Sequence, residues 1–111
     1  GAAVSWARAC RLDELADGVP RGVLIGESRV ALVRDGDAVH AIADECTHAR
    51  VLLSLGDFDR ELHTLECVGH GVRFDLTTGE PLEPPASRPV PLYPTTIDGE
   101  HVLVDLQPKE S

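Results

Sequence analysis

Two short cysteine–histidine motifs constrain the fold of this 111-residue chain more than any other feature. The first is Cys46-Thr47-His48 and the second is Cys67-Val68-Gly69-His70, with 18 residues between them. Thiolates and imidazoles are common metal ligands, and two such loops can bring four of them to one point. A single Cys or His is usually a buried thiol or a surface imidazole, but two mixed pairs favour a metal site. The fold must then place two loops, distant in sequence, side by side.

The order of the ligands distinguishes between metals. Structural zinc sites usually leave roughly two to four residues between Cys and Cys, and roughly three to five between His and His. Here each loop mixes one Cys with one His, and only Thr47 separates the first pair. A Rieske [2Fe–2S] centre needs this mixture, because one iron takes both thiolates and the other takes both imidazoles. A structural zinc module remains a remote alternative.

Short apolar runs separated by turn residues predict an all-β fold. The predicted strands cover residues 30–34, 38–44, 72–76, 92–97 and 101–106. Asp35-Gly36-Asp37 and Asp98-Gly99 each join two of these runs, which predicts two hairpins, because Gly accepts a positive φ without steric cost. Only residues 12–16 suggest a helix, of about one turn.

Prolines are concentrated near the C-terminal end, where six of the eight lie between residues 81 and 94. Because proline has no N–H to donate to a neighbouring strand, residues 81–91 are predicted to form an irregular loop. Pro94 falls inside a predicted strand, which indicates an edge strand or a bulge at that point.

Composition excludes several functions. The formal net charge is −9, from 19 acidic and 10 basic residues, so the chain is a poor candidate for binding nucleic acid or an anionic membrane. No apolar run approaches the roughly 18 residues of a membrane span, and the N-terminus has no signal-peptide pattern. Three cysteines are an odd number for a disulfide scaffold and favour a reducing compartment, so we expect a cytoplasmic protein.

Residues 46–59 and 66–106 resemble a Rieske ferredoxin. The family pattern is C-x-H, a spacer of roughly twenty residues, C-x-x-H-G-x-x-F-D-x-x-T-G, a proline-rich segment and a final hairpin. The residues that match it are Cys46, His48, Cys67, His70, Gly71, Phe74, Asp75, Thr78 and Gly79. The resemblance implies one Rieske [2Fe–2S] cluster, with Cys46, His48, Cys67 and His70 as its ligands.

The resemblance also implies a fold and the residues around the cluster. Residues 1–111 would form one Rieske domain of stacked antiparallel sheets, with a small cluster-binding subdomain at about 45–86. Gly69 and Gly71 would let the backbone approach the cluster closely, and Pro84 and Pro85 would belong to a third loop beside it. The imidazole-bound iron lies outermost in the family, so the neighbours of His48 and His70 would form a small docking patch. These neighbours are Arg50, Val51, Leu52 and Val68.

As a function, the resemblance implies a one-electron carrier of a bacterial ring-hydroxylating dioxygenase system, and the first loop resembles that of carbazole-dioxygenase ferredoxins. The chain would accept an electron from an NAD(P)H-dependent flavin reductase and deliver it to a terminal oxygenase, without being a catalyst itself. The main alternative is a Rieske small subunit of another oxidoreductase, such as nitrite reductase, since a fold does not settle a function.

Two pairs of positions depart from the Rieske proteins of respiratory cytochrome complexes. Those proteins carry an extra cysteine in each loop, where this chain has Val51 and Gly69, so no disulfide clamp is expected. They also place Ser and Tyr where this chain has Val72 and Phe74, which offer no hydroxyl donor. Donors to the cluster and its thiolates raise the reduction potential, so a low potential is expected here.

Four remaining residues carry potential ligand atoms that this site does not use. A self-contained oxygenase would need a mononuclear iron held by two His and a carboxylate. His40, His63 and His101 are widely spaced in sequence, so we expect them to be structural or solvent-facing. Cys10 is expected to be a small buried hydrophobe or a thiol without a role.

Overall fold

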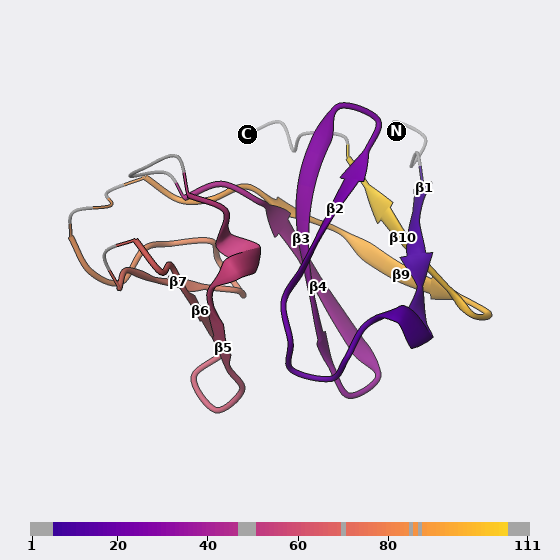
Figure 1. Cartoon of the computed structure of the whole chain (residues 1–111), viewed down its shortest axis with the longest axis horizontal. Coiled ribbons are helices and arrows are strands. Elements are labelled where there is room, and N and C mark those ends of the chain that lie inside the picture. Colours follow the sequence, from indigo (N-terminus) through magenta and orange to yellow (C-terminus); the bar gives the residue numbers. More distant parts are fainter. Residues whose placement is uncertain (1–5, 47–50, 70, 85, 87, 107–111) are drawn as a thin grey trace.

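A computed structural model of the chain describes residues 6–46, 51–69, 71–84, 86 and 88–106. Within these residues, antiparallel strands form three sheets, which confirms the predicted all-β class (Figure 1). In the described part of the chain, helical structure is limited to the short 3-10 turns η1 (Leu12–Glu14) and η2 (Leu53–Leu55). The helical turn predicted for residues 12–16 therefore exists over its first three residues.

The largest sheet has four strands in the order β2-β3-β4-β8. These are β2 (Arg21–Ile25), β3 (Ser28–Asp35), β4 (Ala38–Ala43) and β8 (Leu92–Tyr93). The β3–β4 register runs from Asp35 opposite Ala38 to Val30 opposite Ala43, and Gly36 in the turn has a φ of 62°. The hairpin predicted at Asp35-Gly36-Asp37 is confirmed.

The second sheet has the order β1-β10-β9, with β1 (Trp6–Arg11), β9 (Thr95–Asp98) and β10 (His101–Asp105). The prediction of one strand over residues 92–97 is wrong, because Pro94 divides it. The part before Pro94 pairs with β4, and the part after it pairs with β10 in a different sheet. Proline cannot donate to a ladder, and this break lets the chain cross between sheets. Both pieces are edge strands, as Pro94 indicated.

A third sheet of very short strands lies beside the other two, at the left of Figure 1. It consists of β5 (Asp57–Asp59), β6 (Thr64–Glu66) and β7 (Arg73–Asp75), in that order. β7 lies within the strand predicted at residues 72–76, but β5 and β6 were not predicted, and neither were β1 and β2. Three residues are too few to show a period of two, so pairing with neighbours defines these strands.

Strand β3 separates two hydrophobic cores, and four of its residues are completely buried. Val30 and Leu32 face a cluster that includes Val102 and Val104 of β10, whereas Ala31 and Val33 face a cluster that reaches the β5–β6–β7 sheet. Alternate side chains of a strand point to opposite faces, so β3 is the wall between the two cores. As composition suggests, both cores are mainly aliphatic; Phe74 is the largest fully buried side chain.

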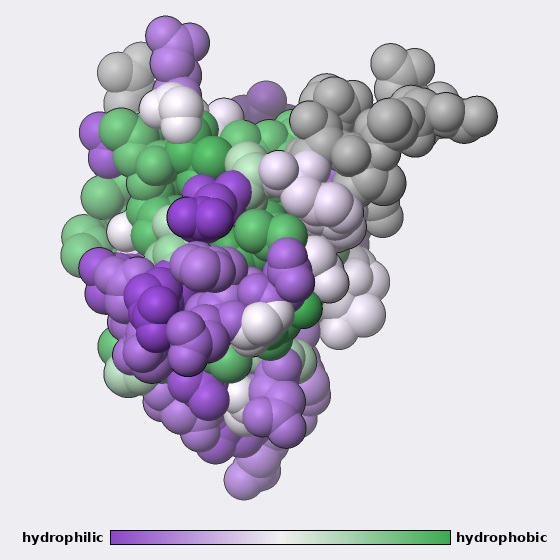
Figure 2. Space-filling view, turned by 90° about the vertical axis from the view of Figure 1, so that its right-hand side faces the viewer, coloured by the Kyte–Doolittle hydropathy of each residue, from purple (hydrophilic) through white to green (hydrophobic). Residues whose placement is uncertain are grey.

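The end of the molecule away from the β5–β6–β7 sheet has a polar part and a hydrophobic part. Figure 2 shows the end that carries β1 and the β9–β10 hairpin, where hydrophilic side chains cover the lower half and hydrophobic ones gather above them. Among the described residues, no helix has the length and apolar character needed to cross a bilayer.

Candidate metal centre

Cys46 and Cys67 both end up buried in the same hydrophobic cluster. Cys46 follows β4 closely and is 3% exposed, while Cys67 comes directly after β6 and is fully buried. All three cysteines of the chain are free thiols. Cys10 lies in β1 and packs against the other cluster, so it belongs to a different part of the molecule.

The two cysteine loops are closed by the same backbone hydrogen bond. The N–H of Cys46 donates to the carbonyl oxygen of Val51 at 2.9 Å, and the N–H of Cys67 donates to that of Val72 at 2.8 Å. Each loop thus returns to its starting cysteine after five residues. The predicted imidazole ligands His48 and His70 belong to these loops, but both lie outside the described residues.

The loops touch one another where Gly69 meets Val51. A Cβ atom at Gly69 would lie 3.3 Å from the Val51 Cγ2 and 3.7 Å from the Cys67 Sγ. A larger residue at position 69 would therefore press the second loop away from the first. Position 71 favours glycine for a different reason: its φ is 69°, a backbone conformation that costs other residues free energy.

Asp44 holds the base of the first loop, and the sequence analysis missed it. Its carboxylate is 3% exposed and accepts two hydrogen bonds from Ser54: Oδ1 from the backbone N–H at 2.7 Å, and Oδ2 from the hydroxyl at 2.6 Å. A buried carboxylate needs such donors. In the sequence, the only indication of this role is that Asp44 stands two residues before Cys46, a predicted ligand.

Glu83 ties the proline-rich loop to β7. Its carboxylate accepts hydrogen bonds from the Arg73 backbone N–H at 2.8 Å and from the Arg73 Nε at 2.7 Å. Ala86 on this loop is buried in the same cluster as the two cysteines, whereas Pro84 is exposed; Pro85 lies outside the described residues. The proline-rich loop therefore packs into the hydrophobic cluster that contains both cysteines.

The residues predicted for docking differ in exposure. Val68, next to Cys67, is 55% exposed, which is high for an apolar side chain. Val51 and Leu52 are half-buried, and Arg50 lies outside the described residues. Leu82 of the proline-rich loop is also 48% exposed and was not predicted.

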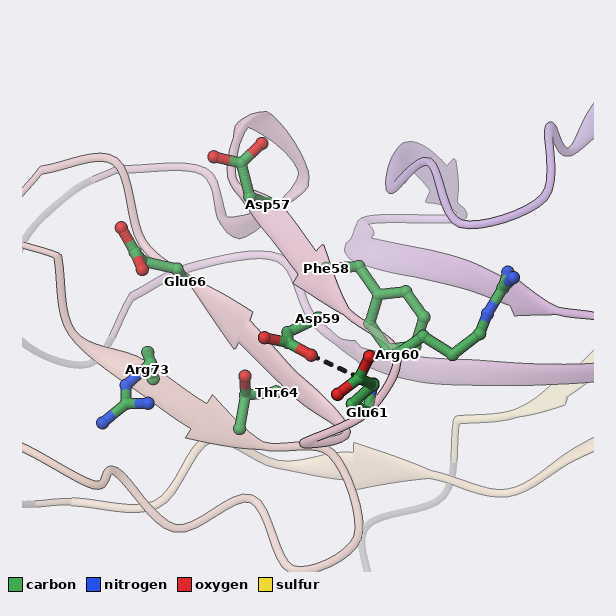
Figure 3. A pocket seen from close by; sticks show the side chains of 8 residues that line it. All are labelled: Asp57, Phe58, Asp59, Arg60, Glu61, Thr64, Glu66 and Arg73. Carbon is green, nitrogen blue, oxygen red and sulfur yellow. Dashed lines mark hydrogen bonds between the residues drawn. The ribbon is translucent and has the colours of Figure 1, made fainter.

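A charged hollow of about 380 Å³ lies on the β5–β6–β7 sheet (Figure 3). Four carboxylates line it, accompanied by Phe58, Thr64 and two arginines. The charged residues are Asp57, Asp59, Arg60, Glu61, Glu66 and Arg73. Acidic side chains thus gather on the same small sheet that leads into Cys67.

The histidines outside the two motifs are not all isolated. The rings of His40 and His63 lie 6.1 Å apart between centroids, at an angle of 88°. His101 lies on β10, in another sheet. His40 lies on β4 and His63 in the turn between β5 and β6, so their rings meet only in the folded chain, which the wide spacing in sequence did not indicate.

The fold and the paired cysteine loops define a cluster-binding β domain of the Rieske class. The model of the Rieske [2Fe–2S] domain matches residues 5–94, so the chain belongs to this family.

Its relatives include electron carriers of dioxygenase systems. The chain is 33% identical over 101 residues to a naphthalene 1,2-dioxygenase ferredoxin component from Pseudomonas aeruginosa, covering 91% of this chain and 95% of the relative. It is 40% identical to the ferredoxin of carbazole 1,9a-dioxygenase from Nocardioides aromaticivorans IC177, with a TM-score of 0.87, covering 95% of this chain and 99% of that one. These names confirm the prediction of an electron-transfer component rather than a catalyst.

Two further structures bear on partners. The chain is 30% identical, with a TM-score of 0.84, to a chain from a complex of reduced oxygenase and oxidized ferredoxin in carbazole 1,9a-dioxygenase, covering 96% of this chain and 97% of that one. A putative NADH-dependent nitrite reductase small subunit from Mycobacterium tuberculosis is also 30% identical, with a TM-score of 0.79, covering 93% and 96%.

The Glu83–Arg73 contact predicts a pH-dependent stability. Hydrogen bonds from the Arg73 side chain and then its backbone N–H lower the pKa of Glu83 below its ordinary 4.5. The contribution of the ionised carboxylate is therefore present above pH 4.5 and is lost as the pH falls through the lowered pKa. Glu83→Gln should slightly lower the melting temperature at pH 7, and this difference from the wild type should shrink at pH 4 and below.

Thermal unfolding at several pH values measures this effect. Glu80→Gln, an exposed change on the same segment with the same loss of charge, is the control and should change the melting temperature less at pH 7. An unchanged difference between wild type and Glu83→Gln at low pH would contradict the prediction.

Proposed function

We propose that this chain is a one-electron carrier that takes electrons from an NAD(P)H-dependent flavin reductase and passes them to a terminal ring-hydroxylating oxygenase. The observation that carries the proposal is the pair of buried thiols, Cys46 and Cys67, at the starts of two equivalent loops in contact with each other. The relatives that are dioxygenase ferredoxins support the choice of pathway.

The donors in these loops suit one Rieske [2Fe–2S] cluster. We assign Cys46 and Cys67 to one iron and His48 and His70 to the other, within a cluster-binding part at about residues 45–86 of a single domain. When bound, the cluster supplies a one-electron redox centre. Two buried thiols in an apolar cluster, neither of them in a disulfide, support the cysteine half of this assignment.

In this proposal, the protein holds the cluster ligands in position and keeps water away from the cluster. The Cys46–Val51 and Cys67–Val72 hydrogen bonds fix the loops, and Asp44 and Glu83 hold the adjoining segments. Val68 beside Cys67 offers an exposed apolar contact, and together with Arg50, Val51 and Leu52 it forms the proposed docking patch. Redox encounters are usually small and transient, which suits a patch of this size.

Charge guides the partners to this patch. The net charge is −9, and the carboxylates of Figure 3 lie on the β5–β6–β7 sheet and its β5–β6 turn, with Cys67 directly after β6. An acidic field speeds encounter with a basic surface, and we infer such surfaces on the reductase and the oxygenase.

The second candidate is the small subunit of another oxidoreductase, such as nitrite reductase. The likeness to the putative nitrite reductase small subunit favours it, at the same 30% identity as the oxygenase-bound chain. Reduction of the holoprotein by a dioxygenase-type reductase, followed by reoxidation by its oxygenase, separates the two functions.

We propose the cytoplasm as the compartment. All three cysteines are free thiols, and Cys10 lies in a different hydrophobic cluster from the other two. Thiols of this kind persist in a reducing environment.

Replacing the proposed ligands tests the site directly. His48→Ala, His70→Ala, Cys46→Ser and Cys67→Ser should each abolish normal cluster assembly, because each removes one of four ligands. Iron and sulfide analysis and the visible spectrum measure the result, with roughly two irons and two sulfides expected per wild-type chain. Cys10→Ser is the control and should retain the full cluster. An unchanged spectrum in either His variant would refute the assignment.

The reduction potential should lie near the low end of the Rieske range, at about −150 mV. Val72 and Phe74 are fully buried beside the second loop and bring no hydroxyl. Val72→Ser and Phe74→Tyr should raise the potential, because a donor to sulfur stabilises the reduced state. Voltammetry measures it, and Phe74→Leu is the control without a donor. A wild-type potential above about +100 mV would contradict the argument.

The docking patch is tested with two exposed apolar residues. Val68→Glu should slow electron transfer to the oxygenase by about tenfold, which corresponds to about 1.4 kcal/mol of lost binding. Leu24→Glu on β2 makes the same chemical change at a side chain that is even more exposed, 65% against 55%. Stopped-flow reoxidation compares the two variants at equal salt. Equal slowing in both would show that charge alone, and not the patch, is responsible.

A further inference from the structure

Three side chains with potential metal ligands meet between two sheets. Asp35 ends β3, His40 lies on β4, and His63 lies in the turn between β5 and β6. One ligand atom from each lies within 4.8 Å of the others. The β3–β4 and β5–β6 turns both lie at the lower edge of the molecule in Figure 1.

We propose that Asp35, His40 and His63 form a second metal site, which binds a divalent transition ion such as Zn²⁺ and joins the four-stranded sheet to the β5–β6–β7 sheet. Two imidazoles and a carboxylate are a common ligand set for zinc. Bonds of about 2.0–2.2 Å place neighbouring ligand atoms of a tetrahedral ion roughly 3.4 Å apart. The three side chains need to approach by little more than about 1 Å to reach this spacing.

A metal ion can reach the three proposed ligands from solvent. His63 is exposed, so an ion can enter from solvent, while Asp35 and His40 are half-buried. Burial lowers the pKa of His40, and the neighbouring His63 lowers it further, against an opposing effect of Asp35. A metal ion binds the neutral imidazole, which keeps a lone pair free.

Arg60 pairs with one oxygen of the Asp35 carboxylate and leaves the other available. Its Nε lies 2.8 Å from the Asp35 Oδ1, and its terminal nitrogen lies 2.6 Å from the Asp17 Oδ1. A carboxylate has two oxygens and about four acceptor sites, so Asp35 can hold Arg60 and an ion together. Hydrogen bonds to the ligating groups are typical of metal sites, and Asp17 offsets the charge of Arg60.

The backbone at His63 is unusual as well. Its φ of 55° makes it the one residue other than glycine with a positive φ in the described part of the chain. Asn or Gly adopts this conformation more easily than His. The hydrogen bond from the Leu76 N–H to the His63 carbonyl oxygen, at 2.8 Å, holds the turn and keeps the imidazole near His40.

The site is separate from the cysteine loops. β6 lies between His63 and Cys67, and four residues of extended chain span about 13 Å. The two sites therefore lie at opposite ends of the same strand. Zinc should bind without displacing iron.

Equilibrium dialysis of the tag-free holoprotein against Zn²⁺ tests the proposal, with zinc and iron measured by mass spectrometry. One zinc per chain should bind at micromolar free ion, with the iron content and visible spectrum unchanged. His40→Asn and His63→Asn should each weaken binding by more than about 100-fold. His101→Asn, on the β1–β10–β9 sheet, is the matched control and should bind as the wild type does. Zinc should also raise the melting temperature of the wild type but not of His63→Asn.

Several outcomes would overturn the proposal. These are full zinc binding by His63→Asn, equal weakening in His101→Asn, or zinc uptake accompanied by loss of iron, which would place the zinc on the cluster ligands instead. Because His63 is exposed in a turn, its variant should fold even if His40→Asn does not. The outcome does not depend on electron transfer, so it can fail while the proposed function stands.

Discussion

The backbone hydrogen bond that closes each cysteine loop is the interaction on which the rest of the site depends. Cys46 and Cys67 are buried in an apolar cluster, where an unpaired N–H would be costly. Each loop satisfies its cysteine N–H internally, with the carbonyl of Val51 or Val72. Both cysteines can therefore be buried in the hydrophobic cluster with their backbone N–H groups paired.

The segments that flank the two loops are anchored by the sheets behind them. β3 is buried on both faces and is shared by two cores, so the cluster that contains both cysteines packs on a strand that cannot move independently. Asp44 and Ser54 then link the end of the β4 segment to η2, and Glu83 links the proline-rich loop to β7. Sites built on rigid elements hold their geometry more accurately than sites on free loops.

Local chemistry made part of this structure predictable. Asp35-Gly36-Asp37 indicated a hairpin because glycine tolerates the positive φ of the turn, and the two cysteine–histidine motifs indicated both loops. Pro94 marked a break, although sequence alone did not show that the chain changes sheets there. β5 and β6 escaped prediction because three-residue strands carry no periodic signal and exist through pairing. Asp44 was missed because the two donors that satisfy its buried carboxylate belong to Ser54, ten residues away. His40 and His63 meet only through packing of two sheets.

A sheet of three-residue strands is marginal by itself and must be fastened at its ends. At one end, β6 runs into Cys67 and the shared hydrophobic cluster. At the other, Arg60 reaches from the β5–β6 turn to Asp17 and Asp35. Ion pairs at an exposed surface hold weakly, because solvent screens them and the side chains lose entropy. Three ligands on one ion would hold the same two turns more firmly, since metal binding free energy adds directly to folding. Asp35, His40 and His63 lie at the less firmly held end of the smallest sheet. A metal ion bound there would stabilise the sheet where its other contacts are weakest.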